Sequence, residues 1–439
     1  MQPVRTVNVG IIGLGTVGGG VAQLIRRNAA RYLAMQDIDL RIVKACARHE
    51  ERAHELGLSP EVFTTDWHEV TEDDRIDIVV EVIGGEHPAL DIMLDAFAHG
   101  KHVVSANKAL LARRMDEIAQ MARGNGTALR CEAAVAGGIP IVSTLEHDLA
   151  GNRILAIAGI MNGTTNYILS RMADEGISYD EVLADAQRLG YAEADPTADV
   201  DGLDAAAKIA ILASIAFGTR VSADDVYTEG IRAIEAADIA FARELGYTIK
   251  LLAGASEGPD GIRAHVYPAL VESRHMLAGV SGAMNAVTVV GDGVGETMFY
   301  GAGAGAFPTA SAVVGDVLAL AEPLARGMQP VAEPEPYGRV LPIASQDEAE
   351  TSYYVRLRIS DTQAVDEATS ALAAQGVNVM RSMIRQGDDL QMALLTDSHS
   401  DAVLINAIES LKACTHVIDI AQAIRVEDVR SWSADALDN

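Results

Sequence analysis

Residues 7 to 18 read VNVGIIGLGTVG, a short apolar run that leads directly into a Gly-x-Gly-x-x-Gly pattern formed by Gly13, Gly15 and Gly18. Such a turn follows the first strand of a dinucleotide-binding sheet. One glycine permits the tight turn, one lets the backbone approach a pyrophosphate, and one lets the next helix lie close to the strand. The next helix is expected to start near Val17, and Thr16 and Val17 would lie at its N-terminus, where free N–H groups and the helix dipole favour an anion. The segment therefore predicts nucleotide binding.

Composition limits the class of protein. The chain has 439 residues, enough for two or three domains, and 49% hydrophobic with 22% charged residues is typical of a globular protein. No run approaches the roughly 18 apolar residues of a membrane span, and the N-terminus leaves no room for a signal peptide. Cys46, Cys131 and Cys414 are too scattered for a disulfide framework or metal cluster. We therefore expect a cytoplasmic protein without a membrane partner.

Charge limits the partners further. The net charge of −28 argues against a nucleic-acid partner, because the summed field of the protein repels phosphates. An anionic cofactor would have to be held by local groups instead.

The pattern of apolar runs changes along the chain. Strand-like and helix-like stretches alternate over residues 1–140, which predicts a doubly wound parallel sheet, completed by 302–325. Residues 141–301 mix helices with strands joined by turns, typical of an α+β substrate or dimerisation domain. Residues 326–350 are rich in Pro, Glu and Gly and are expected to form a linker. Residues 351–439 read as a βαββαβ module.

Two basic residues are candidates for cofactor binding. The second predicted strand ends in Ala-Cys-Ala-Arg-His without the acid that would bind a free ribose 2′-hydroxyl, and Arg48 suits a 2′-phosphate instead. This favours NADP, with NAD still possible. Lys108 closes the fourth strand, at the edge where ligands bind in such sheets. Each residue has a plainer interpretation as a solvated surface side chain.

The segment GYAEADPTADVDGLDAAAKIAILASIAF carries the most specific pattern of charges. Asp204 and Lys208 are four residues apart and share one helix face. A surface ion pair is the usual fate of this spacing. However, Lys208 is the only charge between Ala205 and Phe217, and burying a lone lysine is costly unless it is paired. The pattern favours a general acid over a surface pair.

A glycine-rich turn with one carboxylate, CEAAVAGGIP, follows the fifth predicted strand. Such a turn exposes backbone carbonyls that suit a monovalent cation, or it forms a simple bend between domains. Spacing alone favours the bend.

In chain order, these segments resemble the homoserine dehydrogenase family: GLGTVG, EVIGG, SANKALLA, EAAVAGGIPI, MNGTTNYIL, GYAEADPTADVDGLDAAAKIAILA and GAGAGAFPTASAVVGD. The resemblance covers roughly residues 7 to 325. The C-terminal module is similar to an ACT domain, a small module found in many bacterial members.

The resemblance implies roles for single residues. Lys208 would be the proton donor and Asp204 its catalytic neighbour. Glu193 would bind the substrate amino group, in a pocket lined by Tyr191, Thr164 and Asp199. Lys108 and Gly305 would lie beside the cofactor. The family also implies a sodium ion, held by the Glu132 side chain and the carbonyls of Val135, Gly137 and Ile139.

These inferences predict a homodimeric or homotetrameric, NADP-preferring enzyme that interconverts L-aspartate 4-semialdehyde and L-homoserine. An enzyme that forms the semialdehyde from an acyl phosphate would need an activated cysteine, and Cys131 has no histidine partner in the sequence pattern. A non-catalytic NADP-binding amino-acid sensor is the alternative from another class.

The C-terminal module departs from the family pattern at its effector turn. Gln363 and Ala364 stand where Pro and Gly are expected, and a Cβ at Ala364 disfavours a positive φ. Asn378 would still supply a polar contact. We therefore expect weak or absent inhibition by L-threonine.

Overall fold

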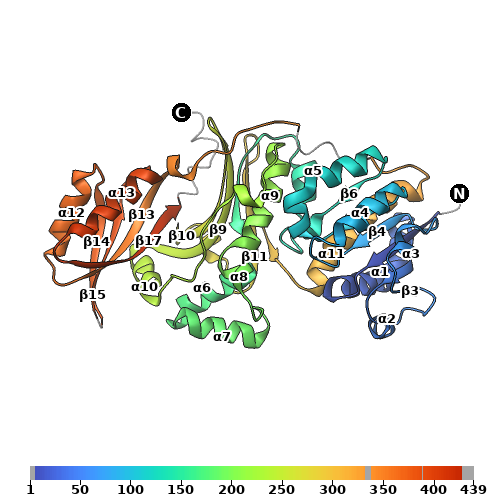
Figure 1. The fold of residues 1–439 in the computed structure, drawn as a ribbon, viewed down its shortest axis with the longest axis horizontal. Coiled ribbons are helices and arrows are strands. Elements are labelled where there is room, and N and C mark those ends of the chain that lie inside the picture. Colours follow the sequence, from blue (N-terminus) through green and yellow to red (C-terminus); the bar gives the residue numbers. More distant parts are fainter. Residues whose placement is uncertain (1–4, 332–337, 388, 428–439) are drawn as a thin grey trace. The chain divides into compact units, whose positions relative to one another are not determined.

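A computed structural model describes residues 5–331, 338–387 and 389–427 (Figure 1). The chain forms two compact units. The first contains residues 1–152, 210–223 and 299–341, and the second contains 153–209, 224–298 and 342–439.

The first unit is built on a six-stranded parallel sheet with the strand order β3-β2-β1-β4-β5-β6. Its strands are β1 (Thr6–Ile12), β2 (Asp39–Cys46), β3 (Phe63–Thr64), β4 (Ile78–Glu81), β5 (His102–Ser105) and β6 (Leu129–Arg130). This order belongs to Rossmann sheets, and ligands bind where it reverses, beyond the carboxyl ends of β1 and β4. The predicted doubly wound parallel sheet is confirmed.

Helices accompany this sheet in the alternation that the sequence predicted (Figure 1). They are α1 (Thr16–Gln36), α2 (Glu50–Glu55), α3 (His68–Thr71), α4 (Ala89–Ala98), α5 (Lys108–Gly124) and, from the distant end of the chain, α11 (Ala306–Ala325).

Helix α11 is long and apolar enough to cross a membrane by length and composition. Its residues Val313, Val317 and Leu320 are nevertheless buried in the same apolar core as Val9 and Ile11 of β1. Its place in this core explains its composition, because that face is already covered by protein.

The second unit contains an eleven-stranded mixed sheet with the order β12-β11-β7-β9-β10-β17-β13-β15-β14 along its main path. The strands of its first half are β7 (Ile154–Ile160), β9 (Tyr247–Gly258), β10 (Gly261–Glu272), β11 (Met284–Gly291) and β12 (Gly295–Ala302), with the short β8 (Tyr227–Thr228) paired to β10. The helices of this region are α6 (Gly163–Glu175), α7 (Tyr179–Leu189), α8 (Thr197–Val200), α9 (Leu203–Phe217) and α10 (Ala236–Leu245).

The C-terminal segment has the predicted βαββαβ element order. Its elements are β13 (Glu350–Ile359), α12 (Ala364–Ala374), β14 (Val379–Gln386), β15 (Leu390–Thr396), the short β16 (His399–Ser400), α13 (Asp401–Ser410) and β17 (Val417–Glu427). It does not form a compact unit of its own, since β17 pairs in parallel with β10 over Ala269–Val271.

Buried ion pairs strengthen this junction. The guanidinium of Arg356 on β13 donates to Asp238 on α10, and both side chains are fully buried. Arg425 on β17 donates to Asp401 and Glu229 and lies over the ring of Tyr267. Because removing one partner would leave a buried charge unpaired, these contacts tie the C-terminal segment to the middle of the chain.

The structure therefore groups residues differently from the sequence-based division. The expected regulatory domain at 351–439 shares a unit and a sheet with the middle region, and the second half of α9 groups with the nucleotide-binding unit, although α9 is one continuous helix. The expected linker at 326–350 is partly outside the described residues. Its described end is anchored, since the Arg339 N–H donates to the Gly218 carbonyl at 2.8 Å and Ala344 donates to Ile262 at 2.8 Å.

Candidate active site

The glycine-rich turn after β1 has the geometry that its three glycines predicted. Gly13 has a φ of +106°, which residues with a Cβ rarely adopt. A Cβ added to Gly15 would meet no heavy atom within 4 Å, so this position is open to a ligand. A Cβ on Gly18 would lie 1.8 Å from the Gly13 carbonyl oxygen, so only glycine allows α1 to lie this close. The helix begins at Thr16, one residue before Val17, and no side chain caps its N-terminus.

A second glycine turn lies in the same unit. Gly305, with a φ of +127°, precedes α11, and again no side chain caps the helix. The first turn of α11 packs against α1, since a Cβ on Gly20 would lie 2.7 Å from the Ala306 carbonyl oxygen. Both helix N-termini therefore offer backbone N–H groups to an anion in one region of this unit.

The carboxyl ends of β4 and β5 are held together by a buried carboxylate, Glu81. It accepts hydrogen bonds from the Ser105 hydroxyl at 2.8 Å and from the Ile83 N–H at 2.9 Å. Asn107 caps α5, and Lys108 is the first residue of that helix, half-buried at the ligand-binding edge. Arg48 is exposed just after β2. Sequence reasoning missed Glu81, although a lone acid at the end of an apolar strand could have indicated it.

Lys208 lies in the second unit as a buried ion pair, rather than on the surface. Its Nζ donates to Asp204 Oδ2 at 2.6 Å and to the Met161 carbonyl at 2.7 Å, and the two side chains are each only 10% exposed. The helical spacing of four residues produces this contact, because Asp204 lies in the first turn of α9. An ammonium with two acceptors has one more N–H, which can reach a substrate oxygen.

Asn162 connects the carboxylates of this site, and sequence reasoning did not single it out. Its amide nitrogen donates to Asp199 Oδ1 at 2.7 Å and to Asp204 Oδ2 at 2.9 Å, while its oxygen caps α6 by accepting from the Thr165 N–H at 2.8 Å. Burial raises the pKa of the Asp199 carboxyl, the nearby Asp204 charge acts in the same direction, and the Asn162 hydrogen bond opposes both. The signal for Asn162 was its place after a strand and before Gly-Thr-Thr, typical of an N-cap.

The other predicted substrate residues differ in their contacts. The Thr164 hydroxyl donates to the Tyr191 carbonyl at 2.8 Å, and it lies close enough to Asp199 to lower the pKa of that carboxyl. The ring of Tyr191 packs on that of Tyr167. The Glu193 side chain is exposed, and only its backbone carbonyl has a protein partner among the described residues, the Gln187 amide.

Glu132 has a structural partnership that the sequence did not reveal. It lies in a short 3-10 turn after β6 instead of at the end of a longer strand. Its carboxylate is buried and accepts three backbone N–H bonds of 2.7–2.9 Å, from Ile141, Val142 and Ser143. It thus caps the helical turn that follows. Among the described residues, no hydrogen bond goes to the carbonyls of Val135, Gly137 or Ile139, and no group of three or more His, Cys, Asp or Glu side chains could hold a metal.

Comparison with known proteins shows the family of this chain. The family model "Homoserine dehydrogenase" matches residues 140–318, and "Homoserine dehydrogenase, NAD binding domain" matches 13–132. The chain is 41% identical to the homoserine dehydrogenase of Neisseria gonorrhoeae over 97% of this chain and 99% of that protein. It belongs to the homoserine dehydrogenase family.

Two further comparisons agree. The Synechocystis homoserine dehydrogenase is 52% identical over 71% of this chain and 73% of its own length. The crystal structure of a homoserine dehydrogenase from Thiobacillus denitrificans superposes with a TM-score of 0.90 and 42% identity, covering 98% of this chain and all of that one. The reaction of the present chain is therefore the NAD(P)-dependent oxidation of homoserine and the reverse reduction.

Proposed function

We propose that this homoserine dehydrogenase reduces L-aspartate 4-semialdehyde to L-homoserine with Lys208 as proton donor. The observation that carries the assignment is the buried ammonium of Lys208, which Asp204 and the Met161 carbonyl hold by hydrogen bonds of 2.6 and 2.7 Å. When bound, the nicotinamide supplies the hydride. Lys208 stabilises negative charge on the substrate oxygen and transfers a proton to it.

Neighbouring side chains would orient the substrate. Asp204 keeps the Lys208 ammonium in place, and Asn162 keeps Asp204 in place. The exposed Glu193 carboxylate suits the substrate ammonium, and Thr164, Tyr191 and Asp199 would line the pocket. A carboxylate that receives an ammonium forms a charge-assisted hydrogen bond, so Glu193 would contribute mainly to substrate affinity.

For the cofactor, the uncapped start of α1 and the open face of Gly15 would receive the pyrophosphate. Gly305 would approach it from the second turn. Arg48 would bind a 2′-phosphate by its forked donors and so favour NADP over NAD. Lys108 would lie near the nicotinamide or a phosphate.

The loop after Glu132 fits a sodium ion. The three carbonyls without hydrogen bonds, at Val135, Gly137 and Ile139, are hard oxygen donors, and a carboxylate that accepts three N–H bonds retains capacity for one more partner. Ala136 and Gly137 both have positive φ, which curls this loop. The ion would stabilise the loop and supply no group to the reaction.

The C-terminal segment would be an ACT-like module used mainly for contacts in a homodimer or homotetramer of a cytoplasmic enzyme. Ala364 is buried in the core, and the Asn378 side chain donates to Asp397 at 2.7 Å. Both features support weak or absent inhibition by L-threonine. Initial rates measured against threonine concentration test this, and strong inhibition would show that the altered turn still binds the effector.

The decisive test of the proposal is Lys208→Met, which removes the ammonium and keeps an apolar chain on an apolar helix. General acid catalysis is typically worth about 10²–10⁴-fold, so kcat for homoserine oxidation should fall by that factor. NADPH affinity, measured by fluorescence titration, should stay unchanged. A variant with near-normal turnover would overturn the assignment.

A further inference from the structure

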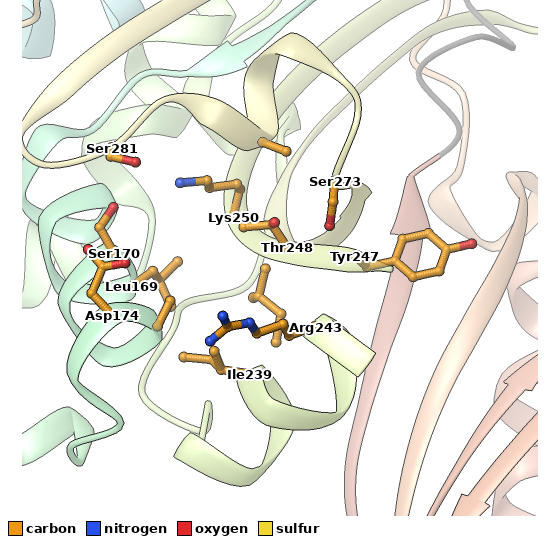
Figure 2. Close-up of a pocket in the computed structure, with 13 residues that line it drawn as sticks. Leu169, Ser170, Asp174, Ile239, Arg243, Tyr247, Thr248, Lys250, Ser273 and Ser281 are labelled. Carbon is orange, nitrogen blue, oxygen red and sulfur yellow. The ribbon is translucent and has the colours of Figure 1, made fainter. Parts of the chain in front are cut away.

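A cavity in the second unit lies between α6, α10 and the start of β9 (Figure 2). Its volume is about 410 Å³, within the range of roughly 300–1,000 Å³ that is usual for ligand sites. None of its lining residues belongs to the Lys208 cluster. The polar side chains that line it are Ser170, Asp174, Arg243, Tyr247, Thr248, Lys250, Ser273 and Ser281.

The innermost charged group of the cavity is Lys250, which is 2% exposed. Its Nζ donates to the Val280 carbonyl at 2.6 Å and to Asn166 Oδ1 at 3.0 Å, which leaves one N–H for another acceptor. Burial lowers the pKa of Lys250 to about 8, while the charge of Asp174 opposes that shift. An anion bound beside this ammonium would raise the pKa of Lys250 again, because a nearby opposite charge favours the charged form.

Two exposed charged residues, Arg243 and Asp174, line the same cavity from α10 and α6. Figure 2 shows the Arg243 side chain extended across the cavity between these helices. Among the described residues, neither the Arg243 guanidinium nor the Asp174 carboxylate makes a hydrogen bond or ion pair. Both charged groups are exposed at the cavity and are therefore available to a ligand.

The charges define the ligand. Two cations, Lys250 and Arg243, complement two carboxylates, and the Asp174 carboxylate complements an ammonium. We propose that this cavity binds an acidic α-amino acid, with its two carboxylates on Lys250 and Arg243 and its ammonium on Asp174. The hydroxyls of Ser170 and Thr248 would supply further hydrogen bonds.

Helix α6 links this cavity to the proposed active site. Asn166, which accepts from Lys250, lies one helical turn after Asn162, which holds Asp199 and Asp204. A ligand that draws the Lys250 ammonium towards the cavity competes with its bond to Asn166. Occupancy would then shift α6 and change the affinity for homoserine, a consequence that rests on the active site proposed above.

Calorimetry on the full chain tests the binding site, with L-aspartate and L-glutamate as probes. We expect at least one to bind once per chain, and Arg243→Ala to weaken it about 10- to 100-fold, the effect of losing one charge-assisted hydrogen bond of about 1.5–3 kcal/mol. Arg188→Ala, another exposed arginine of this unit, is the matched control and should bind normally.

Two further sets of binding measurements identify the class of ligand and show that the probe does not bind at the active site. Succinate and glutarate lack the ammonium and should bind more weakly to the natural chain, and Asp174→Asn should remove that difference. Glu193→Gln and Lys208→Met should leave probe binding unchanged, so a failed active-site assignment does not affect this result. The proposal is overturned if neither amino acid binds, if Arg243→Ala binds normally, or if Glu193→Gln abolishes binding.

Steady-state kinetics test the link through α6. A saturating probe should change the KM for homoserine by about threefold or more, and homoserine should change probe affinity by the same factor, because coupling between binding sites is reciprocal. Arg243→Ala should keep the basal kcat and lose the response. An unchanged KM with a filled cavity would refute the link.

Discussion

Asn162 offers the sharpest test of how the active site is held together. Its side chain has two separable roles, since the oxygen caps α6 while the nitrogen donates to Asp199 and Asp204. Serine is also a good N-cap but has no second donor that reaches both carboxylates. Asn162→Ser should therefore keep the cap and lose the bridge, whereas Asn162→Ala loses both.

The expected magnitudes follow from these contacts. Hydrogen bonds to charged groups are each worth about 1.5–3 kcal/mol, and about 1.4 kcal/mol corresponds to a tenfold change in rate. If one such bond is expressed in the transition state, kcat of Asn162→Ser falls about 10- to 100-fold. Because the cap survives, its stability should exceed that of Asn162→Ala by about 1 kcal/mol.

The pH profile of Asn162→Ser distinguishes the loss of the hydrogen bonds to the two carboxylates from a general loss of folded structure. The Asn162 donor lowers the pKa of Asp199, so its loss should raise that pKa further and move the acidic limb of the kcat/KM profile to higher pH. Homoserine oxidation followed by NADPH absorbance, together with urea unfolding, provides both measurements. If Asn162→Ser shows the natural kcat and an unshifted profile, the bridge does not position the Asp204–Lys208 pair for the reaction.

Three further substitutions give distinct outcomes. Glu193→Gln should raise the KM for homoserine about 10-fold or more, with little change in the KM for NADP, because the amide keeps the shape of the side chain but loses the charge-assisted bond. Unchanged KM values would place Glu193 outside the pocket. Arg48→Asp should shift the ratio of kcat/KM values from NADP towards NAD, and an unchanged ratio would assign the preference to another group. Asp316 is buried on α11, where its Oδ2 accepts from the Glu132 N–H at 2.8 Å. Burial raises the pKa of Asp316 to about 8, so the folded state retains a proton there that the unfolded chain has lost, and stability falls as pH rises from about 4 through 8. Asp316→Asn should remove this loss of stability. Its melting temperature should therefore rise relative to that of the natural chain between pH 5 and pH 9. A difference in melting temperature that stays constant over this pH range would contradict the assignment.

Local patterns were sufficient wherever one segment makes its own structure. The order Gly13, Gly15, Gly18 determined the turn, because each glycine has a steric reason that depends on neighbouring backbone. The alternation of apolar runs determined the parallel sheet and the βαββαβ order. The spacing of Asp204 and Lys208 placed both on one helix face, and the apolar character of that helix indicated a buried pair.

Long-range contacts decided the rest, because a pairing between distant residues leaves no periodic trace in either segment. The sequence by itself determined the family, the Rossmann sheet and the buried Asp204–Lys208 pair. Only the tertiary structure showed that Asn162 bridges two carboxylates, 37 and 42 residues away. It alone joined β17 to β10 in one sheet and brought Lys250, Arg243 and Asp174 to a single cavity. These features depend on how separate elements pack, which local propensity and spacing do not encode.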